Sequence, residues 1–215
     1  LTVNRYIPAG ATNWRMLGSS VSGQTVNEWK DDFYTAGFPG SHSPGFSNPV
    51  GSGILWPSIR WYNETNVGPV VIDGLTGATG TSQPLVAGQG FAAWCGTGFA
   101  TTTAFNVDMS GAPNVASIPI TLPLSYTNTG VPATDGWNMV SNPLPSPIAF
   151  DQISRGADVD DYITYFDPAT GNNATWDISM GVGVNNGTNT VQSSQALWLK
   201  ASGSNVTTTV CESAK

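Results

Sequence analysis

The residues that could support catalysis are few and far apart in this chain. A Ser–His–Asp triad needs a histidine base beside its nucleophile, and the one histidine, His42, falls in the loop-like stretch GSHSPG. Glycoside hydrolysis needs two carboxylates roughly 5–10 Å apart. The three glutamates, Glu28, Glu64 and Glu212, are spread along the sequence instead. We therefore predict a protein that is not an enzyme, with no catalytic and no cofactor-binding residues.

An acidic loop offers the best candidate for a metal site. The stretch ADVDDY places Asp158, Asp160 and Asp161 together just before a predicted strand. Carboxylate oxygens at such spacing can hold Ca²⁺, although the EF-hand pattern is missing. The alternative is a solvated acidic turn without metal.

The aromatic residues suggest a further kind of site, because exposed aromatic rings can form a platform for sugars. Four of the eight tryptophans recur at related positions and are expected in the core: Trp14, Trp94, Trp137 and Trp198. Trp56, Tyr62 and Trp176 are less constrained by that pattern. These three are the candidate glycan-binding residues.

The two cysteines, Cys95 and Cys211, could form one disulfide in an exported chain, either within one molecule or between two. Two buried thiols are the alternative. Neither a CxxC spacing nor a histidine cluster accompanies them, so the sequence argues against a structural zinc site.

Composition narrows the class of protein. Only 10% of the 215 residues are charged, against about 25% in an average soluble domain. Such a neutral polar surface is typical of secreted or cell-surface proteins, so we expect an extracellular location. A net charge of −7 with scattered basic residues argues against nucleic acid as a partner. No apolar run approaches the roughly 18 residues of a membrane span.

Internal similarity predicts how these residues are positioned. Four segments recur in the same order: 13–23 with 136–146, 58–68 with 162–172, 86–94 with 192–200, and 99–105 with 205–211. The last two pairs keep a constant offset, since 106 positions separate Gln89 from Gln195. We predict two related halves, residues 1–112 and 113–215. The first half also carries a loop-like insertion, residues 38–57.

Most segments are short, rich in β-branched and aromatic residues and flanked by Gly, Pro or Asn. They predict an all-β fold of two pseudo-repeated, antiparallel, sandwich-like halves, each with one short helix. Thr25 with Glu28 forms a capping box for the first helix, and Ser146 followed by Pro147 starts the second. Pro119 marks a predicted edge strand. Whether the halves are separate domains or share a core is left open.

Four stretches resemble the β-rich tandem module of large secreted surface proteins of Bacteroidetes: RYIPAGATNWRMLGSSVSGQTVNEW, GWNMVSNPLPSPIAFDQI, YITYFDPATGN and SSQALWLK. The chain departs from that pattern at Ser20 and Leu144, where Pro and an aromatic residue are frequent. The resemblance implies export by type IX secretion, a sorting domain outside these residues, and a non-enzymatic role in adhesins or surface layers.

These observations predict a structural or adhesive module of a secreted bacterial cell-surface protein, and a candidate for self-assembly into a filament or surface layer. The alternative is a carbohydrate-binding module of a surface adhesin or surface enzyme. The expected partners are other copies of the chain or surface glycans.

Overall fold

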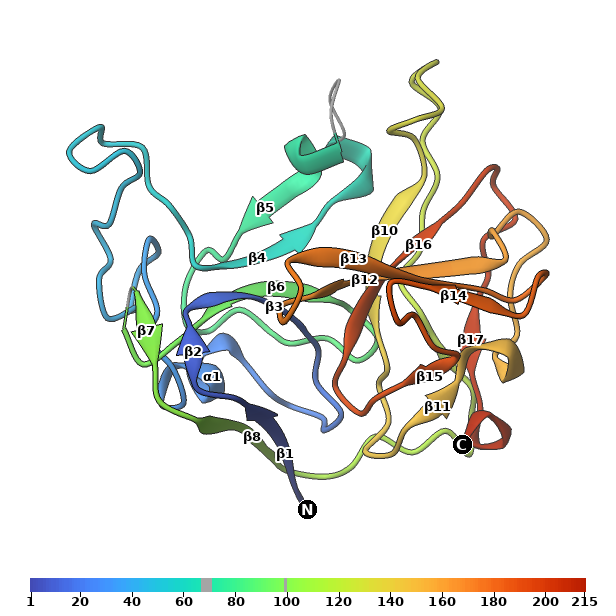
Figure 1. The fold of residues 1–215 in the computed structure, drawn as a ribbon, viewed down its shortest axis with the longest axis horizontal. Coiled ribbons are helices and arrows are strands. Elements are labelled where there is room, and N and C mark those ends of the chain that lie inside the picture. The colour runs from blue at the N-terminus through green and yellow to red at the C-terminus, as the bar shows by residue number, and fades with distance from the viewer. Residues whose placement is uncertain (67–70, 99) are drawn as a thin grey trace.

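The computed structural model describes residues 1–66, 71–98 and 100–215, and these consist mainly of strands, turns and loops (Figure 1). Residues 67–70 and 99 lie outside this description, and they include residues 67 and 68 of the repeated segment 58–68 and residue 99 of the segment 99–105. The prediction of an all-β protein is confirmed, because the strands form antiparallel sheets and helices are few. No described helix is long and apolar enough to cross a membrane.

The first half is built on a four-stranded antiparallel sheet with the strand order β3-β6-β4-β5. Its strands are β3 (Asn13–Leu17), β4 (Ile59–Tyr62), β5 (Leu75–Gly77) and β6 (Phe91–Cys95). Two short ladders flank it: β1 (Thr2–Ile7) with β8 (Phe105–Ser110), and β2 (Gly10–Ala11) with β7 (Thr101–Thr102). The helical elements are α1 (Val26–Lys30) and the 3-10 turns η1 (Glu64–Asn66) and η2 (Val71–Gly74).

The second half is built on a five-stranded antiparallel sheet with the strand order β10-β16-β12-β13-β14. Its strands are β10 (Trp137–Ser141), β12 (Tyr162–Asp167), β13 (Asn172–Asp177), β14 (Val182–Val184) and β16 (Ala196–Lys200). Two short ladders complete it: β11 (Ile148–Ala149) with β15 (Thr190–Val191), and β9 (Ile120–Thr121) with β17 (Thr209–Val210). The 3-10 turns are η3 (Phe150–Gln152) and η4 (Glu212–Ala214).

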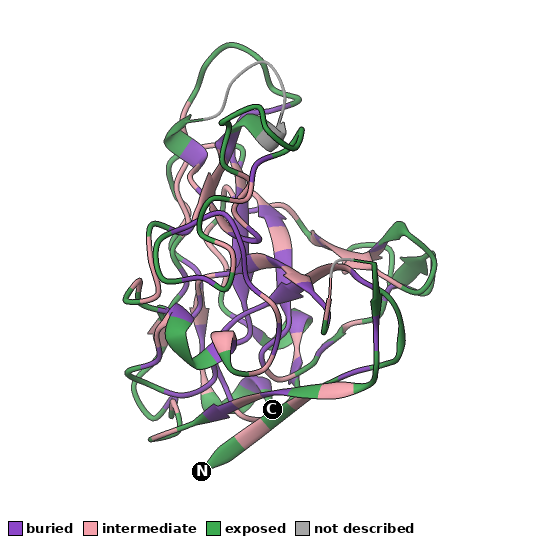
Figure 2. Cartoon of the chain, turned by 90° about the vertical axis from the view of Figure 1, so that its left-hand side faces the viewer, coloured by how far each residue is buried: buried purple, intermediate pink, exposed green. Residues whose placement is uncertain are grey.

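Alternation along β6 shows why these segments form strands with one buried face. Phe91, Ala93 and Cys95 are buried in the core of the first half, whereas Ala92 and Trp94 point to the other face and are half-buried. Successive side chains of a strand leave opposite faces, so a period of two divides inner from outer positions. Buried residues accordingly follow the strands, and exposed residues concentrate in the loops (Figure 2).

The helix of the first half forms as predicted. Thr25 precedes α1 with extended backbone, and its hydroxyl accepts a hydrogen bond from the Asn27 N–H at 3.3 Å. Val26 and Trp29 form its buried side, and Trp29 stacks edge-to-face on Phe91 with ring centroids 5.6 Å apart. The helix therefore covers the inner face of the four-stranded sheet.

The helix expected to start at Ser146 does not form, and this prediction is corrected. The chain instead continues as strand β11, in which Ile148 lies opposite Val191, and then makes the single 3-10 turn η3. The Ser146 carbonyl accepts a hydrogen bond from the Asn142 side chain at 2.8 Å. Pairing with β15 therefore replaces the helix that the local signals indicated.

Each half has its own apolar core, and a third cluster joins the two. Leu17, Ile59 and Phe91 belong to the core of the first half, and Ile163 and Leu199 belong to the core of the second. The third cluster contains four buried residues contributed by both halves: Met16, Tyr62, Met139 and Ala196. The halves are thus in direct contact through buried side chains.

The expectation that the recurring tryptophans fill the core is wrong. Among the tryptophans, Trp29 is fully buried, whereas the four recurring ones are half-buried on the outer faces of the two sheets: Trp14, Trp94, Trp137 and Trp198. Smaller side chains of the same strands, such as Ala93 and Leu199, occupy the inner positions.

The two antiparallel sheets pair their strands in corresponding registers. In β3 and β6, Trp14 lies opposite Trp94 and Met16 opposite Ala92. In β10 and β16, Trp137 lies opposite Lys200 and Met139 opposite Trp198. The halves also exchange reciprocal backbone contacts, which are the bridges Leu17–Gln195 and Val140–Gln89, and the hydrogen bonds from Gly18 N to Ser194 O at 3.0 Å and from Ser141 N to Gly88 O at 2.8 Å.

Candidate functional site

A groove of about 220 Å³ lies between the two sheets, on the faces opposite their cores. Trp14, Met16, Leu75 and Ala92 line it from the first half, and Met139, Phe166, Asn173 and Trp198 line it from the second. Its walls are apolar apart from the Asn173 carboxamide. An apolar concavity with few polar groups at the junction of two units is the usual form of a small-ligand site.

The groove follows from the side-chain alternation of the two sheets. Met16 and Ala92 face one another across β3 and β6, and Met139 and Trp198 face one another across β10 and β16. All four therefore leave the face opposite the core. Tyr62 of the first half packs edge-to-face on Trp198 of the second, with ring centroids 4.9 Å apart. This contact joins the two halves beside the groove.

Three tryptophans form a cluster on the first-half side. Trp14, Trp56 and Trp94 lie with ring centroids 5.4–5.7 Å apart. The Arg60 guanidinium lies 5.3 Å from the Trp14 ring and 5.3 Å from the Trp56 ring, which is within the range of a cation–π contact. Burial against these rings lowers the pKa of Arg60.

The second half presents a similar but smaller cluster. Trp137 and Trp198 meet edge-to-face with ring centroids 6.3 Å apart. Lys200 Nζ lies 5.4 Å from the Trp137 ring and donates a hydrogen bond to the Pro132 carbonyl at 2.7 Å. Aromatic side chains and a cation therefore occupy the outer face of both sheets.

The three residues predicted to bind glycan do not lie together. Trp56 belongs to the tryptophan cluster, whereas Tyr62 is buried against Trp198. Trp176 lies opposite Ile163 and packs against the core of the second half, on the other face of the sheet from Trp198. The sequence analysis missed Phe166 and assigned Trp14 and Trp198 to the core, because alternation in these short strands does not reveal which face is outward.

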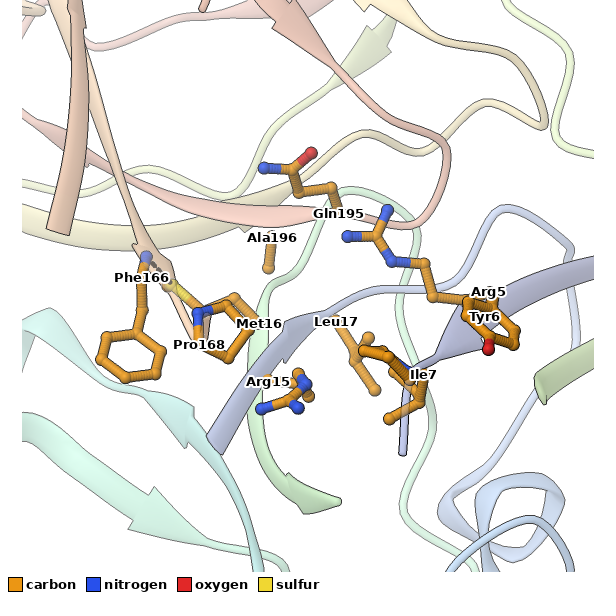
Figure 3. Close-up of a pocket in the computed structure, with 11 residues that line it drawn as sticks. Arg5, Tyr6, Ile7, Arg15, Met16, Leu17, Phe166, Pro168, Gln195 and Ala196 are labelled. Atoms are coloured by element: carbon orange, nitrogen blue, oxygen red, sulfur yellow. Dashed lines mark hydrogen bonds between the residues drawn. The ribbon is translucent and has the colours of Figure 1, made fainter. Parts of the chain in front are cut away.

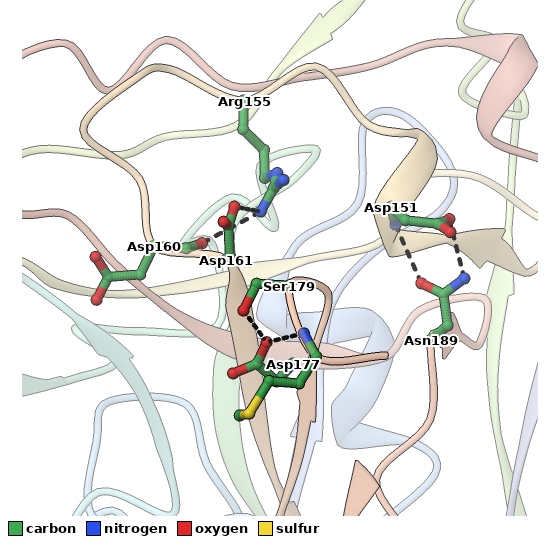
Figure 4. A network of polar contacts seen from close by, with 8 residues as sticks. Asp151, Arg155, Asp160, Asp161, Asp177, Ser179 and Asn189 are labelled. Carbon is green, nitrogen blue, oxygen red and sulfur yellow. Dashed lines mark hydrogen bonds and ion pairs between the residues drawn. The ribbon is translucent and has the colours of Figure 1, made fainter. Parts of the chain in front are cut away.

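The acidic loop is engaged by groups of the protein itself. Asp161 forms an ion pair with Arg155 at 2.9 Å (Figure 4). Asp158 accepts a hydrogen bond from the Asn205 N–H at 2.8 Å. The Asp160 side chain points away from this ion pair (Figure 4). Within residues 1–66, 71–98 and 100–215, no three acidic, histidine or cysteine side chains are grouped as metal ligands. The calcium site at Asp158, Asp160 and Asp161 therefore stays a prediction, and in this structure two of its carboxylates are engaged by Arg155 and by the Asn205 N–H.

The lone histidine has a structural environment. His42 is exposed, and its ring stacks on Tyr34 with centroids 4.9 Å apart. Its Nδ1 lies 3.2 Å from the Thr35 N–H and 3.1 Å from the Thr35 hydroxyl. These contacts fix the base of the insertion, whose tip is exposed at Val50 and Ile54.

Both cysteines are free thiols in this structure, so no disulfide joins Cys95 to Cys211 within one molecule. Cys95 is fully buried in the first core, where burial raises its pKa. Cys211 is half-buried in the second half, just before η4. The two residues belong to different halves of the molecule.

Glu64 is buried and connects the two halves. Its carboxylate accepts hydrogen bonds from the Thr127 N–H at 2.6 Å, the Thr127 hydroxyl at 2.9 Å and the Ser125 hydroxyl at 3.0 Å. It also accepts one from the Gly136 N–H at 3.3 Å. All four donors belong to the second half, so Glu64 holds that half against β4 and η1.

Comparison with known proteins adds no relative. The chain matches no family model, no curated protein and no solved structure at a significant level.

Proposed function

We propose that this chain is a non-enzymatic adhesive module of a secreted bacterial cell-surface protein, and that the groove between its halves binds a glycan. The aromatic groove is the observation that carries this proposal. The resemblance to type IX-secreted surface modules and the low content of charged residues support the location.

We also infer that residues 1–112 and 113–215 are copies of one sandwich-like unit. The strand orders β3-β6-β4-β5 and β10-β16-β12-β13 correspond. The alignment of segment 13–23 with 136–146 and of segment 86–94 with 192–200 carries the pair Met16–Ala92 onto the pair Met139–Trp198. The reciprocal bridges Leu17–Gln195 and Val140–Gln89 support an approximate two-fold relation between the copies.

The chemistry of the groove suits one sugar ring. Trp14, Trp198 and Phe166 supply aromatic surface for the apolar face of a pyranose, and Asn173 supplies a hydrogen-bonding group. A volume of about 220 Å³ is below the roughly 300–1,000 Å³ of sites for drug-sized ligands. The groove therefore fits a single residue of a longer, otherwise exposed chain.

A glycan array followed by calorimetric titration tests this proposal. We expect binding to be lost in Phe166→Ala and in Ala92→Phe, which fills the groove, whereas Ile118→Ala, at an exposed position outside the groove, keeps it. Thermal melting checks that each variant is folded. Unchanged binding in both folded groove variants would contradict the proposal, as would the absence of any glycan ligand.

Self-association is a second candidate role, favoured by strand β14. This strand lies at the end of the five-stranded sheet and exposes Val182 and Val184. An apolar edge strand can pair with another chain. We expect sedimentation velocity to show concentration-dependent oligomers that Val184→Lys abolishes. Val115→Lys is the control, since Val115 is 59% exposed and Val184 57%; equal oligomerisation of both variants would exclude this edge.

A further inference from the structure

A second cavity of about 170 Å³ adjoins the groove (Figure 3). Met16 and Phe166 line both cavities, so the two are neighbours. The second cavity differs in character, because Arg5 of β1, Arg15 of β3 and the Gln195 side chain contribute to its wall. Two of the seven basic residues of an acidic chain thus meet at one small cavity beside the proposed ligand site.

The two guanidinium groups have few partners. The Arg5 guanidinium donates to the Ser193 carbonyl at 3.4 Å, and that of Arg15 donates to the Trp14 carbonyl at 3.1 Å. A guanidinium carries five N–H donors, so most remain available. The ion pairs found among the described residues are Arg155–Asp161 and Lys215–Glu212, and neither involves this cavity.

The electrostatic balance of the cavity favours an anion. Burial and the nearby charge of Arg15 both lower the pKa of Arg5. A lowered pKa means that the positive charge of Arg5 is not balanced by a nearby negative charge. Burial lowers the pKa of Arg15, and the nearby Cys95 thiol and Asp167 carboxylate offset only part of that effect. The oxygens of Asp167 accept hydrogen bonds from the Ala169 N–H at 2.9 Å and the Thr170 hydroxyl at 3.1 Å, in the turn after β12.

Gln195 adds a neutral donor to the same cavity. Its Oε1 accepts a hydrogen bond from the Gln192 N–H at 3.0 Å, which orients the carboxamide and leaves its NH₂ group to donate. Gln195 is buried, with 8% of the residue exposed. The cavity wall therefore includes two guanidinium groups and the Gln195 side chain. A guanidinium group matches the geometry of a planar carboxylate, with which it can form two hydrogen bonds.

We infer that the Arg5–Arg15 cavity binds the carboxylate of an acidic sugar, such as a uronic acid, whose ring lies in the adjoining groove. This inference rests on the proposed glycan-binding function and names its ligand class. The carboxylate accepts hydrogen bonds from the two guanidinium groups, while Phe166 and Met16 contact the ring. Neutral sugars fill the groove alone.

The test compares three probes by calorimetric titration of the purified chain: an oligogalacturonate, its methyl ester, and free galacturonic acid. We expect the oligogalacturonate to bind at least tenfold more tightly than the ester. Arg15→Gln and Arg5→Gln should remove that preference without weakening binding of the ester. Arg155→Gln, which removes an equal charge outside this cavity, should leave the preference intact. Free galacturonic acid should bind more weakly than the oligomer, since only the oligomer contacts the rim of the groove.

The outcomes separate the two claims. Equal affinity for the oligogalacturonate and its ester, with binding still lost in Phe166→Ala, overturns the carboxylate site and leaves the glycan proposal standing. A preference that Arg155→Gln also removes would reflect net charge and overturn the inference. If none of the three probes binds, the inference is overturned. The proposed function is then decided separately, by whether any other glycan on the array binds. Arg5→Lys keeps the positive charge but removes the planar guanidinium group, and so shows whether a loss of the preference reflects the geometry of that group. Thermal melting shows whether a variant is unfolded.

Discussion

At the scale of single residues, the buried carboxylate of Glu64 fixes the position of a loop of the second half. Glu64 is 3% exposed and accepts four hydrogen bonds from residues that follow it by more than sixty positions. A carboxylate can be buried when hydrogen-bond donors replace its water. Its role is therefore to bring the segment around Ser125 and Thr127 against the end of β4.

We expect Glu64→Ala to lower the free energy of unfolding by about 3 kcal/mol, because several buried donors lose a charged acceptor. Glu28→Ala is the control, since its exposed side chain makes one long contact with Thr25 at 3.5 Å. Urea denaturation measures both. A loss below about 1 kcal/mol for Glu64→Ala would mean that this contact contributes little.

Asp32 provides a pH-dependent contribution to stability. Burial, with the nearby charge of Asp108, raises its pKa from 3.8 to about 7 although it accepts a hydrogen bond from the Asp108 N–H at 2.9 Å. The folded state therefore keeps a proton that the unfolded chain releases between about pH 4 and 7. Since the folded state binds more protons in this window, stability falls as pH rises through it.

We expect Asp32→Asn to remove this part of the pH dependence, because a carboxamide still accepts the Asp108 hydrogen bond but does not ionise. The quantity to measure is the difference in melting temperature between the variant and the parent chain at pH 4, 5.5 and 7. The melting temperature of the variant should rise relative to that of the parent chain as pH rises. A difference that stays constant across these three values would show that Asp32 does not titrate in this range.

At the scale of elements, the contact between the two sheets depends on small residues at strand ends. Gly90 precedes β6, and a Cβ there would lie 2.7 Å from the Val140 carbonyl oxygen and 2.8 Å from the Met139 side chain. The backbones of the two halves approach closely at this point, where Gly90 N donates to Met139 O at 3.0 Å. A larger residue would push β6 away from β10.

We expect Gly90→Ala to lower the free energy of unfolding by about 2 kcal/mol through overpacking against backbone. Gly45→Ala is the matched control, because a Cβ at Gly45 meets nothing within 4 Å. Chemical denaturation of the two variants gives the comparison. Equal stability of both would mean that the halves can separate locally without cost.

At the scale of the whole molecule, the buried cluster of Met16, Tyr62, Met139 and Ala196 joins the two cores. Each half alone would expose the face that lines the groove. Calorimetry should therefore show one unfolding transition for the full chain, and residues 113–215 expressed alone should melt at a lower temperature. Two resolved transitions would instead indicate independent domains.

Sequence reasoning was successful where a signal is local. Thr25 and Glu28 identified α1, and the β-branched and aromatic runs identified the main strands. It failed at Ser146, where the local signals for a helix were as strong as those at Thr25. The pairing of Ile148 with Val191 replaced that helix. Nor does spacing along the chain reveal the hydrogen bond between Asp158 and the Asn205 N–H or the ion pair between Asp161 and Arg155.

The amino-acid sequence by itself determined the β class, the segments that form strands and the first helix, because these depend on neighbouring residues and on a period of two. The tertiary structure decided which face of each sheet is buried, and so placed Trp14 and Trp198 beside a groove and not in a core. It also brought Arg5 and Arg15 to one cavity. Such placements depend on the pairing of strands far apart in the chain, and no local pattern specifies that pairing.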